Sequence, residues 1–362
     1  MSSSGDGERI KNMNPALNEL VDTGRLQEWA LAHGLGSGAI DGVRVLAGGS
    51  QNVLVRFSIG ARRFVLRRPA LHARPDAART VGREAQVLSA LAHTGVPHAR
   101  LAAPAEENAD VIGAPFYVME YVDGFHVLDL PDAAGTDPAF KTTMSLALVD
   151  SLAQLSAIDP ESIGLGGFGR LDDFLERQVP RWARQLESYS EFDSWPGVSS
   201  LPGIVEVGGW LNANRPASFD PGLMHGDFHV GNVLFRRVGN GSEVAAIIDW
   251  EMAALGAPLL DLARLLVSWP DATGESSLSL PIDWAGFPSR EVLIERYQLR
   301  TGCDLAQLPW FEMLACYKLA IILEGTHARA CAGLASADAG ARLHASALKL
   351  LKRTHKIFQA MA

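Results

Sequence analysis

Residues 225–232 of this chain have the sequence HGDFHVGN, and they lead directly into the short apolar run VLF at residues 233–235. The loop offers a carboxylate at Asp227 and, further along, an amide oxygen at Asn232. Phosphoryl transfer to a hydroxyl needs such groups, because the nucleophile must be oriented while oxygen ligands hold Mg²⁺ beside the phosphates. The alternative is a plain polar turn, since Asp, Asn and Gly are all common in turns. The spacing favours a phosphoryl-transfer loop.

A second apolar run also ends in a carboxylate. Residues 245–251 have the sequence AAIIDWE, so Asp249 directly follows an expected buried strand. A strand that delivers a carboxylate at its C-terminal end holds a metal ligand rigidly. An aspartate that only caps the strand end is the alternative, but the position shortly after Asn232 favours a metal ligand. Glu251 is either a further polar contact or a surface residue.

Together these residues resemble the aminoglycoside phosphotransferase and choline kinase family, the small-molecule relatives of the protein kinases. There, a loop HGDxxxxN and a following apolar segment that ends in Asp-Trp or Asp-Phe form the catalytic and metal sites. The resemblance implies that Asp227 is the catalytic base, that Asn232 and Asp249 are Mg²⁺ ligands, and that ATP is the phosphoryl donor. It further implies that Asp261, in PLLDLARLL, braces the catalytic loop, although an aspartate there could simply cap a helix.

The first part of the chain is similar to the same family. Residues 46–53, LAGGSQNV, are a glycine-rich turn between two expected strands, and backbone N–H groups of such a turn can cover phosphates. A simple hairpin turn is the alternative. The motif Gly-Lys-Ser/Thr occurs nowhere in the chain, which disfavours a P-loop kinase.

The family usually places a lysine from a strand on the nucleotide phosphates, but this chain has no lysine between residues 12 and 140. Arg67, in FVLRRP, stands at the matching point, and strand alternation puts Val65 on the same face, where it would meet the adenine. Arginine keeps the charge but is bulkier. Glu84, on the following helix, is the expected ion-pair partner of Arg67, or else a solvated glutamate. An arginine at this point is similar to the phosphotransferase-like domains associated with acyl-CoA dehydrogenases.

Residues 119–122, MEYV, match the family's hinge between lobes, where backbone groups of Glu120 and Val122 would hydrogen-bond the adenine edge; a mere strand end is the alternative. The resemblance therefore implies a catalytic set of Asp227, Arg67 and Glu84, and metal ligands Asn232 and Asp249. It implies nucleotide binding by Gly48, Gly49, Ser50, Asn52, Val65, Arg67, Glu120 and Val122.

The order of elements indicates an α+β, two-lobed protein-kinase-like fold, with an antiparallel sheet and one helix before a mainly helical part. We expect a disordered tail at 1–14, a nucleotide-binding lobe at 15–122 with a hinge at 119–124, and a catalytic and substrate lobe at 125–362. The expected helices are 22–34, 76–93, 138–157, 172–190 and 202–213; the expected strands lie within 43–67, 100–106 and 115–122; a loop-and-strand island spans 222–256, and helices follow from 258.

Composition limits the remaining possibilities. The 362 residues carry a net charge of −9, without the basic stripe that a nucleic-acid partner requires. Three widely spaced cysteines fit neither a disulfide framework nor a zinc site and indicate a reducing, cytoplasmic setting. We expect no signal peptide, no membrane span and no membrane partner.

These observations favour a kinase for a small hydroxylated molecule, with an unknown oligomeric state. The competing hypothesis is a catalytically silent nucleotide-binding module, supported by Arg67 in place of lysine. Aminoglycoside resistance is a narrower version of the first hypothesis. The sequence does not favour it, because acidic residues are not concentrated in the C-terminal third. Glu324 and His327, on a late helix, are either structural or part of an acceptor site.

Overall fold

The structure is a computed structural model that describes residues 17–48, 52–71, 77–130, 137–278 and 281–361. The expected tail at 1–14 lies outside the described residues. The chain divides into two compact units. The first comprises Met1–Thr94 and His98–Asp123, and the second comprises Gly95–Pro97 and Gly124–Ala362.

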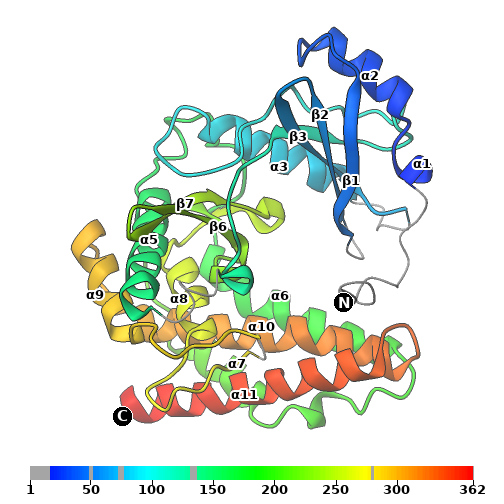
Figure 1. The fold of residues 1–362 in the computed structure, drawn as a ribbon. Helices are drawn as coiled ribbons and strands as arrows, with labels where there is room; N and C mark the ends of the chain where they lie inside the picture. Colours follow the sequence, from blue (N-terminus) through cyan, green and yellow to red (C-terminus); the bar gives the residue numbers. More distant parts are fainter. Residues whose placement is uncertain (1–16, 49–51, 72–76, 131–136, 279–280, 362) are drawn as a thin grey trace, which may run out of the picture. The chain divides into compact units, whose positions relative to one another are not determined.

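The first unit is built on a four-stranded antiparallel sheet in the order β1-β2-β3-β4 (Figure 1). The strands are β1 (Ile40–Gly48), β2 (Asn52–Ile59), β3 (Arg62–Pro69) and β4 (Tyr117–Glu120), and the helices are α1 (Leu17–Leu20), α2 (Thr23–Ala32) and α3 (Ala77–Leu91). Gly60, with a φ of 59°, makes the tight turn between β2 and β3.

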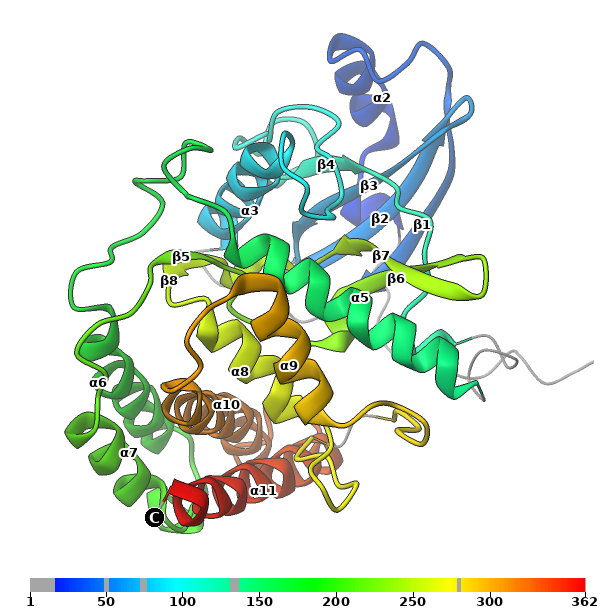
Figure 2. The same ribbon diagram turned by 90° about the vertical axis from the view of Figure 1, so that its left-hand side faces the viewer.

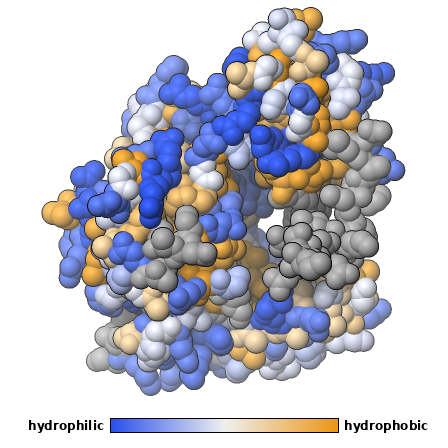
Figure 3. Space-filling view, viewed as in Figure 1, coloured by the Kyte–Doolittle hydropathy of each residue, from blue (hydrophilic) through white to orange (hydrophobic). Residues whose placement is uncertain are grey.

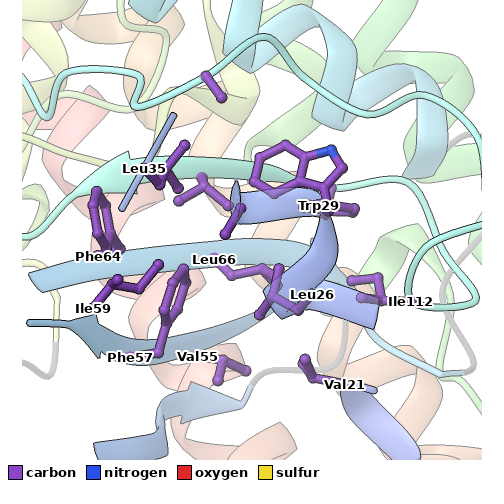
Figure 4. Close-up of a cluster of buried hydrophobic side chains, with 14 of the residues drawn as sticks. Val21, Leu26, Trp29, Leu35, Val55, Phe57, Ile59, Phe64, Leu66 and Ile112 are labelled. Carbon is purple, nitrogen blue, oxygen red and sulfur yellow. The ribbon is translucent and has the colours of Figure 1, made fainter. Parts of the chain in front are cut away.

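The core of this unit lies between α2 and one face of the sheet (Figure 4). Alternate residues of β2 are buried, as expected for a strand with one face against a core. Phe57 and Phe64 stack at 5.4 Å between ring centroids, and Trp29 of α2 belongs to the same buried cluster. The α2 helix begins where Asp22 accepts a hydrogen bond from the N–H of Arg25 at 3.0 Å.

The expected strand at 100–106 is wrong as a regular strand. Only isolated bridges form there, between Leu101 and Met119 and between Glu106 and Phe116. Pro104 lies between the two bridges and has no N–H to donate, so a continuous ladder cannot form. The other expected elements of this unit are present with ends shifted by a few residues.

The second unit is mainly helical and contains two small two-stranded sheets, β5-β8 and β6-β7. Its strands are β5 (Gly222–Met224), β6 (Val233–Val238), β7 (Gly241–Ile247) and β8 (Ala254–Gly256). Its α-helices are α5 (Pro138–Ser156), α6 (Phe174–Glu187), α7 (Ile204–Ala213), α8 (Leu259–Ser268), α9 (Arg290–Thr301), α10 (Leu308–Cys331) and α11 (Ala337–Met361). Its short 3-10 helices are η1 (Val127–Asp129), η2 (Ser188–Glu191), η3 (Val198–Ser200), η4 (Val230–Asn232) and η5 (Trp250–Met252).

The long helices α10 and α11 form an antiparallel pair, and α5 lies beside α9 (Figure 2). Helix α10 is apolar almost all round and its middle is buried, with side chains such as Phe311, Leu314 and Ile321 fully enclosed. It therefore forms the central support for the loops that carry the polar residues of this unit.

The surface mixes polar and apolar side chains. On the face shown in Figure 3, hydrophilic residues are interspersed with hydrophobic ones. Large exposed apolar side chains such as Leu31, Val205 and Leu299 come from different helices. None of the described helices combines the length and the apolar character that crossing a bilayer requires.

Candidate active site

The HGD loop follows directly after β5 and makes a turn that only glycine can adopt. Gly226 has a φ of 84°, in the left-handed region. A Cβ at this position would lie 2.2 Å from the backbone oxygen of Met252, well inside the contact limit. The glycine of the motif therefore allows the backbone of the loop to approach η5 closely and carries Asp227 to a fixed point.

Asp261, in the first turn of α8, holds this loop in place through hydrogen bonds. Its two carboxylate oxygens accept the backbone N–H groups of His225 at 2.6 Å and Gly226 at 2.8 Å. The side chain is buried, and burial raises the pKa of Asp261 even though these donors favour the charged form. The alternative reading of Asp261 as a helix cap is wrong, because Pro258 occupies the cap position.

His225 ties the catalytic loop to the segment after β7. Its ring Nε2 lies 2.9 Å from the carbonyl oxygen of Ile248, and its Nδ1 lies 3.3 Å from the N–H of Asp227. These partners fit a neutral imidazole that donates from Nε2 and accepts at Nδ1. The histidine of the motif is thus fully buried, and its hydrogen bonds connect the segment that carries Asp227 to the segment that carries Asp249.

Asp227 is held as a carboxylate by cations. Its Oδ1 accepts a hydrogen bond from Nε of Arg264 at 2.7 Å, and Nε2 of His229 lies 3.6 Å from its Oδ2. Burial alone would raise the pKa of Asp227, but Arg264, His229 and Lys318 together outweigh it and hold the pKa far below the usual range. Asp227 is therefore ionised at neutral pH.

Asn232 lies beside this carboxylate, and the residue before Asp249 pairs with the backbone of Asn232. The side-chain amide of Asn232 donates to the backbone oxygen of Asp227 at 3.0 Å and to its Oδ2 at 3.3 Å, which leaves the amide oxygen of Asn232 pointing elsewhere. The N–H of Ile248 donates to the backbone oxygen of Asn232 at 3.0 Å. Asp249 is the next residue along the chain. Its strained backbone φ of 66° turns it away from the direction of strand β7. Oxygen ligands of this kind fit a hard cation such as Mg²⁺.

A pocket of about 260 Å³ opens beside Asp227. Lys318 of α10 enters it and donates from Nζ to the backbone oxygen of Gly226 at 2.8 Å. Burial lowers the pKa of Lys318 to about 8, against the opposing effect of Asp227. The remaining lining comes from Glu251, Met252, Leu260, Arg264, Ala315, Leu319, Ile322 and Leu323. Two cations, the carboxylate of Glu251 and an apolar wall thus line the pocket with Asp227.

In the first unit, Arg67 and Glu84 form a buried ion pair. Nη2 of Arg67 lies 2.8 Å from Oε1 of Glu84, and their side chains are only 7% and 1% exposed. The hydroxyl of Tyr117 donates to the other carboxylate oxygen of Glu84 at 2.8 Å. Arg67 and Tyr117 are direct partners on β3 and β4, so the strand pairing itself positions both groups around Glu84.

Four of the other expected nucleotide-binding residues, Gly48, Asn52, Val65 and Glu120, lie on the same sheet. Val65 is buried on β3, Gly48 ends β1 and Asn52 begins β2. The N–H of Glu120 donates to the carbonyl oxygen of Arg100 at 2.8 Å. Val122 follows two residues after β4 ends. Gly49 and Ser50 lie outside the described residues.

Sequence reasoning missed Arg264, Lys318 and Tyr117. Arg264 lies three residues after Asp261 on α8, so helical spacing already places both on one face of the helix. Lys318 is 92 residues from Gly226 in sequence, and no local pattern marks it. Glu324 and His327, considered for an acceptor role, do not line the pocket beside Asp227.

An antiparallel sheet with one long helix, followed by a helical unit whose HGD loop is braced from a helix, defines the class of kinase-like phosphotransferases. Residues 42–291, more than half of the chain, match the family described as "Phosphotransferase enzyme family", so the chain belongs to it. This membership confirms the family and the two-lobed protein-kinase-like fold that the sequence predicted.

Named relatives sharpen this placement. The chain is 33% identical over 308 residues to acyl-CoA dehydrogenase family member 11 of Gallus gallus, covering 82% of this chain and 38% of that protein. It is 31% identical over 288 residues to the Homo sapiens member 11, covering 78% and 35%. The chain therefore spans little more than a third of these relatives. The predicted similarity to domains found beside acyl-CoA dehydrogenases is confirmed.

Solved structures show the same fold. A provisionally assigned aminoglycoside phosphotransferase of Ralstonia eutropha JMP134 matches with a TM-score of 0.75 and 26% identity, covering 92% of this chain and 98% of that chain. An aminoglycoside phosphotransferase crystallised with AMP-PNP and hygromycin B matches with a TM-score of 0.59 and 14% identity, covering 90% and 97%.

Proposed function

We propose that this chain is an ATP- and Mg²⁺-dependent kinase that transfers the γ-phosphoryl group to a hydroxyl of a small molecule. One observation carries the proposal. A single loop holds Asp227 as a carboxylate against Arg264, with Asn232 hydrogen-bonded to it and Asp249 beside Asn232 through the Ile248 backbone. A module that only bound a partner would need none of this arrangement.

Each residue then has a physical task. Asn232 and Asp249 supply the oxygen ligands for Mg²⁺, which neutralises charge on the transferring phosphoryl group when it is bound. Arg67 faces the nucleotide phosphates from β3, and Glu84 holds its guanidinium in place with the help of Tyr117. Gly48, Gly49, Ser50 and Asn52 cover the phosphates, and Val65, Glu120 and Val122 hold the adenine.

The low pKa of Asp227 fits the proposed role. A carboxylate so strongly held in the charged form is a weak base and does not remove the acceptor proton before transfer. In a loose phosphoryl-transfer transition state the nucleophile needs orientation more than early deprotonation. Asp227 therefore accepts a hydrogen bond from the acceptor hydroxyl, aims its oxygen, and takes the proton late in the reaction.

Replacement of the carboxylate tests the proposal. We expect Asp227→Ala to abolish turnover in an ATP-consumption assay over a panel of hydroxylated metabolites, while ATP–Mg²⁺ still raises the melting temperature. Asp220→Ala, an exposed aspartate of the same unit, is the matched control and should keep full activity. If nucleotide binding and turnover fell together in Asp227→Ala, the role assigned to Asp227 would be wrong.

The second candidate is a catalytically silent nucleotide-binding module, favoured by Arg67 at the position where the family usually has lysine. It predicts Mg²⁺-dependent stabilisation by ATP without turnover on any acceptor. An assay of the wild type over the acceptor panel separates the two, because the kinase turns over an acceptor and the silent module turns over none. If the arginine causes the silence, Arg67→Lys should restore turnover.

An aminoglycoside is a poor acceptor candidate, although relatives in the fold are aminoglycoside phosphotransferases. Such a drug is a polycation, and here the carboxylates Asp227 and Glu251 are matched by Arg264 and Lys318, so the pocket has no excess of negative charge to attract it. Growth protection against an aminoglycoside panel checks this point, and we expect none.

A further inference from the structure

A second polar cluster lies on α10 and α11, apart from the residues that line the pocket beside Asp227. Glu324, His327 and Cys331 follow one another on α10 at spacings of three and four, so they share one face of that helix. His344 reaches the same place from α11. The proposed kinase chemistry uses none of these four side chains.

Glu324 is the buried centre of the cluster. Its side chain has no exposed surface, yet it is a carboxylate. Its Oε1 accepts a hydrogen bond from the indole N–H of Trp195 at 2.8 Å, and its Oε2 lies 2.7 Å from Nδ1 of His344. The buried carboxylate thus brings an oxygen and an imidazole nitrogen, both of them ligand atoms that zinc accepts, side by side.

The two histidines lie against each other. Their rings stack with centroids 4.4 Å apart and planes 28° from parallel. One ligand atom from each of Glu324, His327 and His344 lies within 4.8 Å of the others. Sγ of Cys331 lies 3.7 Å from Nε2 of His327. With zinc–nitrogen bonds of about 2.0 Å and zinc–sulfur bonds of about 2.3 Å, two nitrogen ligands of a tetrahedral site are roughly 3.3 Å apart, and a nitrogen and a sulfur ligand are roughly 3.5 Å apart.

Two glycines let the surrounding segments come this close. A Cβ on Gly340 of α11 would lie 2.4 Å from Cβ of Ala330 and 3.5 Å from Cα of His327. A Cβ on Gly325 of α10 would lie 2.5 Å from the hydroxyl oxygen of Tyr189. The chain is therefore closely packed on both sides of Glu324. This packing helps to hold the histidine and tryptophan partners of Glu324 in place.

We propose that Glu324, His327 and His344 bind a divalent transition metal such as zinc, and that Cys331, which lies next to His327 but outside this group of three, turns in as a fourth ligand when the metal binds. Imidazole and thiolate ligands favour zinc over magnesium, so this site is chemically distinct from the oxygen ligands Asn232 and Asp249. When the metal binds, it replaces the proton between Oε2 of Glu324 and Nδ1 of His344, and the thiol proton of Cys331 also leaves to solvent. Neither step requires an oxidant or a reductant.

The metal would join three separate segments of the second unit. Helix α10 supplies Glu324 and His327, helix α11 supplies His344, and the segment with Trp195 is attached through Glu324. Because α10 also carries Lys318, a bound metal stabilises the helix that forms one wall of the acceptor pocket. The site is therefore structural, and its readout is metal affinity and melting temperature.

The test uses the full chain without a histidine tag, stripped with a chelator and then titrated with Zn²⁺ in competition with a chromophoric chelator. We expect wild type to bind one tight equivalent and to melt at a higher temperature with zinc. His327→Ala and Glu324→Gln should each weaken that equivalent at least ~10-fold and remove the melting shift. Glu324→Gln keeps the size of the side chain and an oxygen for Trp195, so it guards against a simple folding defect.

His355→Ala is the matched control, because His355 is an exposed histidine of α11 outside the cluster. It should bind zinc like wild type. Co²⁺ substitution examines the thiolate: a sulfur-to-cobalt charge-transfer band should appear in wild type and in Cys303→Ser but not in Cys331→Ser. The proposal is overturned if wild type takes up no tight equivalent, or if His327→Ala and Glu324→Gln keep it unchanged.

Discussion

The Arg264–Asp227 pair is the most informative contact to break. Arg264→Met removes the guanidinium but keeps much of the side-chain volume, and Arg264→Lys is the matched control that retains a charge. Nε of Arg264 lies 2.7 Å from Oδ1 of Asp227, and the Arg264 side chain is 8% exposed while that of Asp227 is 34% exposed. Breaking a fully buried pair costs about 3–5 kcal/mol, so with partial exposure we expect roughly 2–3 kcal/mol at pH 7.

The pH dependence of this loss follows from the sign of the shift. The pKa of Asp227 is depressed in the folded protein, so its pairing stabilises the protein above the unfolded pKa, about 3.9, and that contribution is lost as the pH falls through the folded value. In Arg264→Met, burial still raises the pKa of Asp227 and the strongest opposing charge is gone, so we expect the pKa of Asp227 to be higher than in the wild type. The stability gap between wild type and variant should therefore be full at pH 7 and narrow as the solution is acidified.

Chemical denaturation at several pH values measures this gap, and a pH–rate profile measures its consequence. Wild type should show no acid limb from Asp227, whereas Arg264→Met should gain one as its carboxylate becomes protonated at accessible pH. Arg264→Lys should fall between the two. A gap that stays constant with pH, together with an unaltered acid limb, would refute the conclusion that Arg264 sets the charge of Asp227.

Further tests address the rest of the site. Burial lowers the pKa of Lys318 to about 8, so between pH of about 8 and 10.5 the unfolded chain binds more protons at this group than the folded protein does. The free energy of unfolding should therefore rise with pH in this range, and Lys318→Met should abolish that rise in denaturation curves. Gly226→Ala should lower the free energy of unfolding by roughly 2–4 kcal/mol, because the φ of Gly226 is positive and a Cβ would lie too close to the backbone oxygen of Met252. An unchanged melting temperature would show that the loop can rearrange to accept a side chain. Glu84→Gln should raise the KM for ATP at least ~10-fold, since Arg67 loses its charged partner, whereas Glu107→Gln on the surface should leave it unchanged. Asp249→Asn should move the Mg²⁺ activation curve to higher concentration at least ~10-fold; an identical curve would exclude Asp249 as a ligand.

Local chemistry in the sequence predicted much of this protein. The HGD loop, the apolar strand before Asp249 and the alternation of β2 and β3 are all patterns of neighbouring residues, and they pointed to the family, the fold and the Arg67–Glu84 pair. Such patterns are readable because side-chain direction repeats every two residues in a strand, and because glycine permits turns that other residues avoid. The bracing by Asp261 belongs to this group, since its helix directly follows the catalytic segment.

Tertiary structure alone decided which distant groups surround these residues. Lys318 reaches Gly226, Tyr117 closes the Glu84 carboxylate, and His344 meets Glu324, each pair joined across long stretches of chain. No periodicity links such positions, because their proximity depends on how whole helices pack. The strand expected at 100–106 is wrong for a local reason that the sequence already contains: Pro104 has no N–H to donate, so only isolated bridges form. The sequence thus determines which chemical groups the loops carry. The packing of the helices determines which charged side chains surround those groups.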